Sequence, residues 1–144
     1  MNIYNRIASY FISLCVITLL FVYILKLPDY ITQSPKLIQE YYYKNALSSF
    51  ILDIFLFAAY IFAAMYVGTI LNINQSDNAQ NLIIMILTTI SISGSFMTYF
   101  KLGYNSGTFF SRWFNAVGYK AVLYDIIIVC SVYTMMMIIY NNFF

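Results

Sequence analysis

Charged residues are scarce in this sequence. Only 8% of its 144 residues are charged, whereas 62% are hydrophobic and 20% are aromatic. Soluble domains contain about 25% charged and about 45–50% apolar residues, so this composition excludes an ordinary water-soluble domain. The mean hydropathy of +0.79 points the same way. The composition is that of an integral membrane protein.

Histidine is absent, and the two cysteines are isolated from each other. Cys15 and Cys130 each lie inside an apolar segment, without a CxxC pattern or neighbouring ligands, and we interpret them as small buried hydrophobic residues. The missing histidine removes the side chain most often used for acid–base catalysis near neutral pH. The sequence also contains no glycine-rich phosphate loop. We therefore expect no enzymatic activity, no cofactor and no metal site.

The chain does contain four long apolar runs, which cover residues 7–25, 46–71, 81–100 and 120–140. A membrane-spanning helix needs roughly 20 predominantly apolar residues, and each run provides about that length. The first run is longer than the apolar region of a cleaved signal peptide, so we expect it to remain in the protein. The predicted fold is all-α, with residues 1–144 forming a single four-span membrane domain.

The longest polar segment, residues 26–45, separates the first two apolar runs. Within it, Ser34 followed by Pro35 is typical of the start of a short helix, with serine as the N-cap. An aromatic and basic run ends the segment. Such a run is typical of an aromatic belt at headgroup level, which predicts lipid or partner contacts for Tyr41, Tyr42, Tyr43 and Lys44.

The basic residues are distributed unequally between the two sides of the predicted bundle. One side carries six of them, and the other side carries only Arg6. Cytoplasmic loops of membrane proteins are enriched in lysine and arginine. We therefore predict that loops 26–45 and 101–119 face the cytosol and that both termini lie on the opposite side. The six residues are Lys26, Lys36, Lys44, Lys101, Arg112 and Lys120.

Two acidic residues, Asp53 and Asp125, lie inside predicted spans. A carboxylate at the centre of a bilayer costs about 2.5–3.5 kcal/mol on insertion scales, so each needs a reason to be there. One hypothesis is a path for protons or cations. The other pairs the acids with basic residues or with tyrosine and serine hydroxyls as part of helix packing. No third charge inside the membrane continues a relay, which favours packing.

The segment FFSRWFNAVGYKAVLYD, residues 109–125, precedes and enters the fourth span. Its VGY triplet lacks the threonine and the final glycine of a TVGYG filter, so a potassium-channel filter is not expected. Helical spacing instead predicts an amphipathic interfacial helix before the fourth span, with a bend at Gly118. Its candidate lipid or partner contacts are Arg112, Trp113, Phe114 and Lys120. The aromatic face predicted by this spacing comprises Phe110, Trp113, Phe114, Val117, Ala121 and Tyr124.

The pattern F-x-R-W-F-x-x-V-G-x-x-A-V-x-Y-D, from Phe110 to Asp125, resembles segments of small multi-pass membrane proteins of nucleocytoplasmic large DNA viruses. A composition rich in residues with AT-rich codons agrees with such a source. The resemblance implies a structural protein of the internal membrane beneath an icosahedral capsid. It also implies that loops 26–45 and 101–119 contact minor capsid proteins.

We therefore expect a structural, non-enzymatic membrane protein whose partners are the lipid bilayer and neighbouring membrane or capsid proteins, but not nucleic acid. A homo- or hetero-oligomer is compatible with the sequence. Two alternatives remain open. One is a small proton or cation channel or transporter that uses Asp53 and Asp125, and the other is an accessory subunit of an organellar membrane complex.

Overall fold

A computed structural model describes residues 2–144, and over these residues every regular secondary-structure element is a helix, without strands. Four of the described segments are long and apolar enough to cross a membrane. The protein is thus an all-α, multi-pass membrane protein, as the apolar runs predict. The four spans are Ile3–Ile24, Ala46–Ile70, Asn78–Leu102 and Tyr119–Phe143.

Polar residues at the helix ends set the limits of the spans. The first span consists of α1 (Ile3–Thr18) and the π-helical η1 (Leu19–Ile24), and the third is α5 (Asn78–Leu102). Both begin several residues before the predicted runs. The reason is capping: Asn2 Oδ1 accepts a hydrogen bond from the Tyr4 amide, and Asp77 Oδ1 accepts one from the Gln80 amide, each at 3.0 Å.

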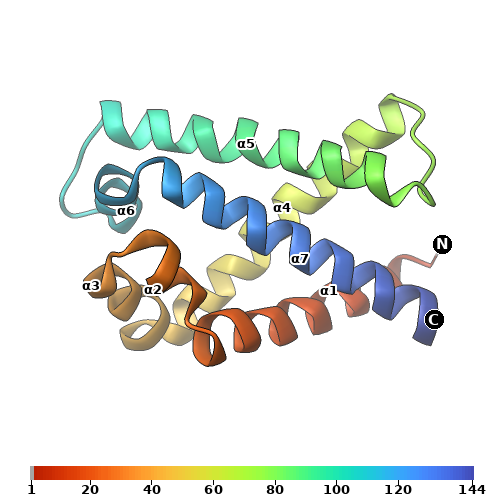
Figure 1. Cartoon of the computed structure of the whole chain (residues 1–144), viewed down its shortest axis with the longest axis horizontal. Coiled ribbons are helices and arrows are strands. Elements are labelled where there is room, and N and C mark those ends of the chain that lie inside the picture. Colours follow the sequence, from red (N-terminus) through yellow and green to blue (C-terminus); the bar gives the residue numbers. More distant parts are fainter. Residues whose placement is uncertain (1) are drawn as a thin grey trace.

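The long helices run along the long axis of the molecule (Figure 1). α7 (Tyr119–Phe143) packs against both α1 and α5, while α4 (Ala46–Ile70) packs mainly against α5. Both termini and the α4–α5 connection lie at one end of the bundle (Figure 1). The connecting segments 25–45 and 103–118 lie at the other end, which we call the basic end because six of the seven lysine and arginine residues lie there.

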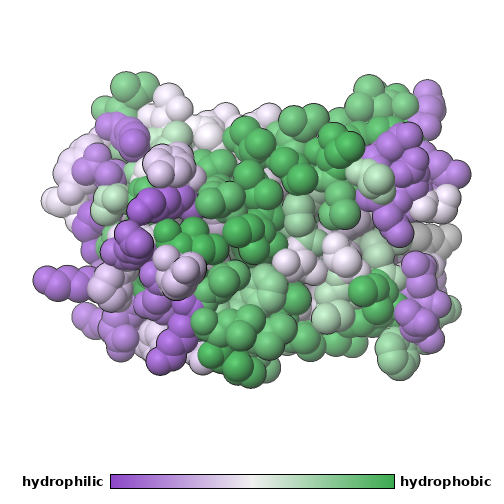
Figure 2. Space-filling model, viewed as in Figure 1, coloured by the Kyte–Doolittle hydropathy of each residue, from purple (hydrophilic) through white to green (hydrophobic). Residues whose placement is uncertain are grey.

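Apolar side chains cover the sides of the bundle as well as its interior. Figure 2 shows an apolar band around the middle of the molecule, flanked by hydrophilic residues at both ends. Large exposed side chains such as Phe55 (70%) and Ile24 (70%) belong to the spans. This pattern suits a lipid surround, in which an outward-facing apolar side chain carries no penalty.

The first connection contains three short helical segments: α2 (Leu27–Thr32), α3 (Pro35–Ile38) and the π-helical η2 (Gln39–Lys44). The predicted short helix therefore does begin at Pro35. Ser34 occupies the predicted N-cap position, but its hydroxyl accepts no hydrogen bond from a helix amide and instead donates to the Thr32 carbonyl oxygen at 3.3 Å.

The prediction of an aromatic belt at headgroup level is wrong for two of its three tyrosines. Tyr41 and Tyr42 retain only 9% and 7% of their surface, since η2 folds back onto α4 and carries both rings into the bundle. Tyr43 points outward and is 39% exposed. It packs edge-on against Tyr23 of η1, with 5.5 Å between the ring centroids.

The second connection at the basic end contains α6 (Phe109–Val117), the predicted amphipathic helix before the fourth span. Gly118 separates α6 from α7 with φ 63° and ψ −135°, a backbone conformation that is essentially restricted to glycine. The predicted bend is therefore a complete helix break. It turns α6 back across the end of the bundle, as Figure 1 shows.

Candidate functional site

Asp53 lies inside the bundle on α4 and is only 3% exposed. The Tyr41 hydroxyl donates a hydrogen bond to Asp53 Oδ1 at 2.5 Å. Tyr41 belongs to η2, so this bond joins the first connection to the second span. No ion pair to Asp53 exists within residues 2–144, and a hydroxyl is its hydrogen-bonding partner.

Asp125 lies on α7, and it too is held by hydroxyl groups. The Ser93 hydroxyl of α5 donates to Asp125 Oδ2 at 2.6 Å, and Ser93 itself is fully buried. Tyr60 of α4, which is 1% exposed, also interacts with Asp125. The packing hypothesis named basic residues or tyrosine and serine hydroxyls as partners for the two acids. In the structure, Asp53 and Asp125 accept hydrogen bonds from tyrosine and serine hydroxyls.

A third hydrogen bond links the tyrosines of the same region. The hydroxyls of Tyr42 and Tyr124 lie 2.8 Å apart, and Tyr124 is 2% exposed. These groups form one unit, which we call the buried polar cluster. Its members are Tyr41, Tyr42, Asp53, Ser93, Tyr124 and Asp125.

A small cavity of about 30 Å³ lies within this region, and both Asp53 and Asp125 line it. A cavity of this size has room for one or two water molecules, since a single water needs roughly 10–15 Å³. The helices thus bring two acids that are 72 residues apart in the sequence to one cavity. Carboxylates and phenol hydroxyls around a water-sized space can hold and exchange protons.

Helix α6 closes the cavity from the basic end with aromatic rings. Phe109, Phe110 and Trp113 line the cavity. Phe109 stacks on Tyr41 with ring centroids 4.9 Å apart, and on Trp113 at 5.9 Å. Stacked rings therefore cover the buried polar cluster on the side of the basic end.

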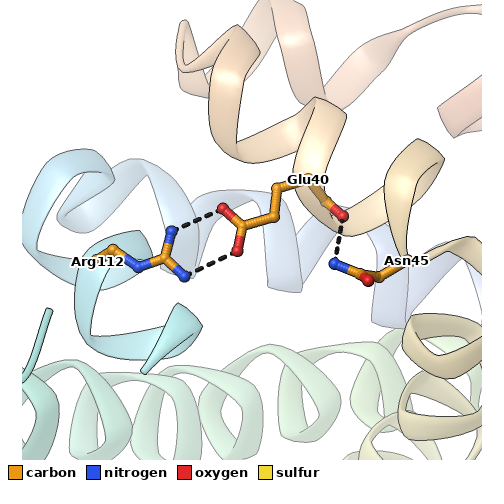
Figure 3. A network of polar contacts seen from close by, with 3 residues as sticks. All are labelled: Glu40, Asn45 and Arg112. Atoms are coloured by element: carbon orange, nitrogen blue, oxygen red, sulfur yellow. Dashed lines mark hydrogen bonds and ion pairs between the residues drawn. The ribbon is translucent and has the colours of Figure 1, made fainter. Parts of the chain in front are cut away.

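An ion pair fastens α6 to the first connection (Figure 3). Arg112 of α6 donates two hydrogen bonds to the Glu40 carboxylate of η2, at 2.6 and 2.8 Å. The Glu40 carbonyl oxygen also accepts from Asn45 Nδ2 at 3.0 Å. The Arg112 guanidinium lies 5.8 Å from the centroid of the Phe109 ring, a cation–π contact. Both ionic side chains are 31% exposed, so the pair lies at the edge of the protein.

These contacts change the pKa values of residues in the connecting segments. The hydrogen bonds from Arg112 lower the pKa of Glu40 below its usual range, and those to Glu40 raise the pKa of Arg112. Burial, followed by the charge of Asp53, raises the pKa of the Tyr41 phenol. Burial also raises the pKa of Tyr42. Both phenols therefore remain protonated hydrogen-bond donors at neutral pH.

The remaining candidate residues from the sequence fall into two groups. Trp113 and Phe114 are only 7% and 4% exposed, so they are packing residues of the bundle and not the lipid or partner contacts that the sequence predicted. Lys44 is exposed, and Lys120 is partly exposed with its ammonium 3.4 Å from Gln33 Oε1. The predicted aromatic face spans the break at Gly118, so its residues belong to two separate helices, α6 and α7.

Sequence reasoning missed Glu40, which neutralises Arg112 from 72 residues away, and it did not connect Ser93 or Tyr60 with Asp125. The sequence does contain a signal that could have identified Glu40 as a partner for a basic residue. Glu40 and Asp29 are the two acidic residues of the first connection, whose other charged residues are lysines. Ser93 had no comparable signal, because α5 contains several small hydroxyl residues with the same local pattern.

Among residues 2–144, no three side chains of the types that bind metals lie close enough to share an ion. The fold and the site define the chain as a four-helix, multi-pass membrane protein with a buried polar cluster closed by a short aromatic helix. No protein-family model, curated protein or solved structure matches the chain.

Proposed function

We propose that this protein is a structural, non-enzymatic component of a membrane, namely the internal membrane of a large DNA virus. Its basic end would face the cytosol and contact lipid and minor capsid proteins through residues 26–45 and 101–119. One observation carries the proposal: both of these connections, with six of the seven lysine and arginine residues, lie at the same end of the bundle. The viral setting rests on the resemblance of residues 110–125.

The packing of the basic end supports a structural role. Stacked aromatic rings and the Arg112–Glu40 ion pair join the two connections directly, so the surface they present is a single folded unit. A preorganised surface binds a partner with less loss of conformational entropy than flexible loops would.

The test is the protein composition of purified particles of the virus that encodes the chain. We expect the chain to remain in gradient-purified particles after protease treatment and to leave with the membrane fraction when detergent is added. Lysine-directed cross-linking of intact particles should join Lys36 to a capsid protein. Absence of the chain from purified particles would overturn the proposal.

A second candidate is a small proton or cation channel or transporter. The observation that favours it is the cavity that Asp53 and Asp125 share. In liposomes that contain the purified protein, this candidate predicts a proton or cation flux that Asp53→Asn or Asp125→Asn reduces. The control is Asp77→Asn, which alters the cap of α5 outside the cavity. An unmutated protein without flux would exclude this candidate.

A further inference from the structure

Each of the four spans has a lysine at its basic end. Lys26 follows the first span by two residues, and Lys44 precedes the second by two residues. Lys101 is the penultimate residue of the third span, and Lys120 is the second residue of the fourth. We call these four residues the lysine ring. At the opposite end of the bundle, the only lysine or arginine is Arg6.

The charges of the lysine ring form no ion pair within residues 2–144, although Lys44 lies near enough to Glu40 to help lower the pKa of that carboxyl. Lys26, Lys44 and Lys101 are exposed, and Lys120 is partly exposed. None of the four forms an ion pair with a carboxylate of residues 2–144. In contrast, Arg112 at the same end is already paired with Glu40. The ring therefore presents four positive charges that are not ion-paired in the part of the chain that the structure describes, because the one acid near Lys44, Glu40, is paired with Arg112.

The position of the ring along the bundle corresponds to the headgroup layer. The four lysines lie where the apolar spans end, and hydrophilic residues at that end directly border the apolar band in Figure 2. Exposed tyrosines accompany them, among them Tyr30 (83%), Tyr119 (72%) and Tyr99 (71%). Tyrosine and lysine at the ends of spans are typical of the membrane–water interface, where the aromatic ring and the cation both reach the headgroups.

We infer that the lysine ring binds the phosphate headgroups of anionic phospholipids in the leaflet at the basic end. The inference rests on the orientation in the proposed function, because the cytosolic leaflet is the anionic one. Lipid fits better than an acidic protein because the four charges come from four different spans, all at the boundary of the apolar band. A bilayer offers phosphates all around that boundary, whereas a protein docked on the end would meet residues farther from the membrane.

The test compares phosphatidylglycerol with phosphatidylcholine of identical acyl chains, added to the purified full-length protein in detergent. Native mass spectrometry counts the lipids that remain bound. We expect the unmutated protein to prefer phosphatidylglycerol, and each Lys→Gln substitution in the ring to reduce this preference by about five-fold. The variant with all four substitutions should bind the two lipids equally.

Two matched controls separate the ring from general charge effects. Lys36→Gln removes a lysine of the same end that does not lie at the end of a span, and Arg6→Gln removes the basic side chain of the other end. Both should keep the preference for phosphatidylglycerol within about two-fold, since neither lies in the ring. Circular dichroism confirms the helical fold of each variant.

Equal binding of the two lipids by the unmutated protein would overturn the inference, and this is also the result expected if the ring instead met an acidic protein. The inference is likewise overturned if the four-lysine variant keeps its preference for phosphatidylglycerol, or if Lys36→Gln loses that preference as strongly as the ring variants do.

Failure of the lipid-binding inference and failure of the proposed function are distinguishable. Lipid preference is measured on the isolated protein, whereas the proposed function depends on its presence in particles.

Discussion

At the scale of single residues, the main energetic problem is the carboxylate of Asp53. An acidic side chain within a membrane span is costly unless it finds a hydrogen-bond donor or a counter-charge. The donor is Tyr41, which reaches Asp53 because η2 carries its ring into the bundle. In the same way, the Ser93 hydroxyl donates a hydrogen bond to the carboxylate of Asp125. Hydroxyl groups therefore perform the role that a lysine or arginine would have in an ion pair.

We expect Tyr41→Phe to destabilise the protein by about 1–3 kcal/mol, because the substitution leaves a buried acceptor without its donor while keeping the ring. The measurement is the free energy of unfolding in mixed micelles, with sodium dodecyl sulfate as denaturant and circular dichroism as the readout. Tyr43→Phe is the matched control, since its ring is exposed and the change should stay within about 0.5 kcal/mol. Equal effects of the two variants would contradict a special role for the Tyr41–Asp53 bond.

The Glu40–Arg112 ion pair predicts a dependence of stability on pH. Because the pKa of Glu40 is lowered in the folded protein, the pair stabilises the fold above the ordinary glutamate pKa of about 4.3. This contribution is lost as the pH falls through the lowered pKa. The unfolding midpoints of the unmutated protein and Glu40→Gln should therefore differ at neutral pH and converge in acid.

Arg112→Gln tests the same pair from the other side. Its difference from the unmutated protein should fall over the same acidic range, because either substitution removes the interaction that lowers the pKa of Glu40. A difference that stays constant from neutral pH to about pH 3 in both variants would show that the ion pair does not depend on ionised Glu40.

At the scale of elements, α6 is the helix that joins the two connections of the basic end. Its aromatic rings pack over the buried polar cluster, and Arg112, beside the Phe109 ring, reaches Glu40. This arrangement requires α6 and α7 to meet at a sharp angle. Gly118 permits the angle because it lacks a Cβ atom and can adopt φ 63° with ψ −135°.

Gly118→Ala should destabilise the protein by about 1–3 kcal/mol, because alanine is strained in this backbone conformation even though there is space for its methyl group. The readout is again the free energy of unfolding in mixed micelles. Gly94→Ala is the control: Gly94 lies inside α5 with nothing within 4 Å of an added Cβ atom. That change should be neutral or stabilise by up to about 1 kcal/mol. A Gly118→Ala variant as stable as Gly94→Ala would contradict the assigned role of the break.

At the scale of the whole molecule, the two ends of the bundle differ in charge and in structure. The basic end contains short helices, aromatic packing and six basic side chains, whereas the other end consists of the termini and the connection 71–77. In a membrane, this asymmetry favours one orientation over the other, because basic loops are retained on the cytosolic side.

Labelling of single cysteines tests this orientation. In a background with Cys15 and Cys130 replaced by alanine, Asn105→Cys should react with a membrane-impermeant maleimide from the cytosolic side, and Ser76→Cys from the opposite side. Both positions are exposed in the structure, so accessibility does not limit the reaction. Gln33→Cys should label together with Asn105→Cys. Labelling of Asn105→Cys and Ser76→Cys from the same side would contradict the predicted topology.

Sequence alone determined the number of spans, their approximate limits, the charge asymmetry and the position of a bend at Gly118, where the structure has a complete helix break. These properties are local: an apolar run of about 20 residues must be helical to satisfy its backbone in lipid, whatever its neighbours are. Likewise, a lysine at the end of a span is visible from the order of residues. The lysine ring follows from such local features.

Only the tertiary structure decided which side chains meet. Tyr41 and Tyr43 belong to the same run of three tyrosines, yet one is buried against Asp53 and the other is exposed, because the way η2 folds onto α4 decides which ring points inward. Glu40 and Arg112 are 72 residues apart, and the pairing of Ser93 with Asp125 depends on how α5 packs against α7. Such contacts between distant residues depend on the relative rotation of packed helices, which composition and periodicity do not specify.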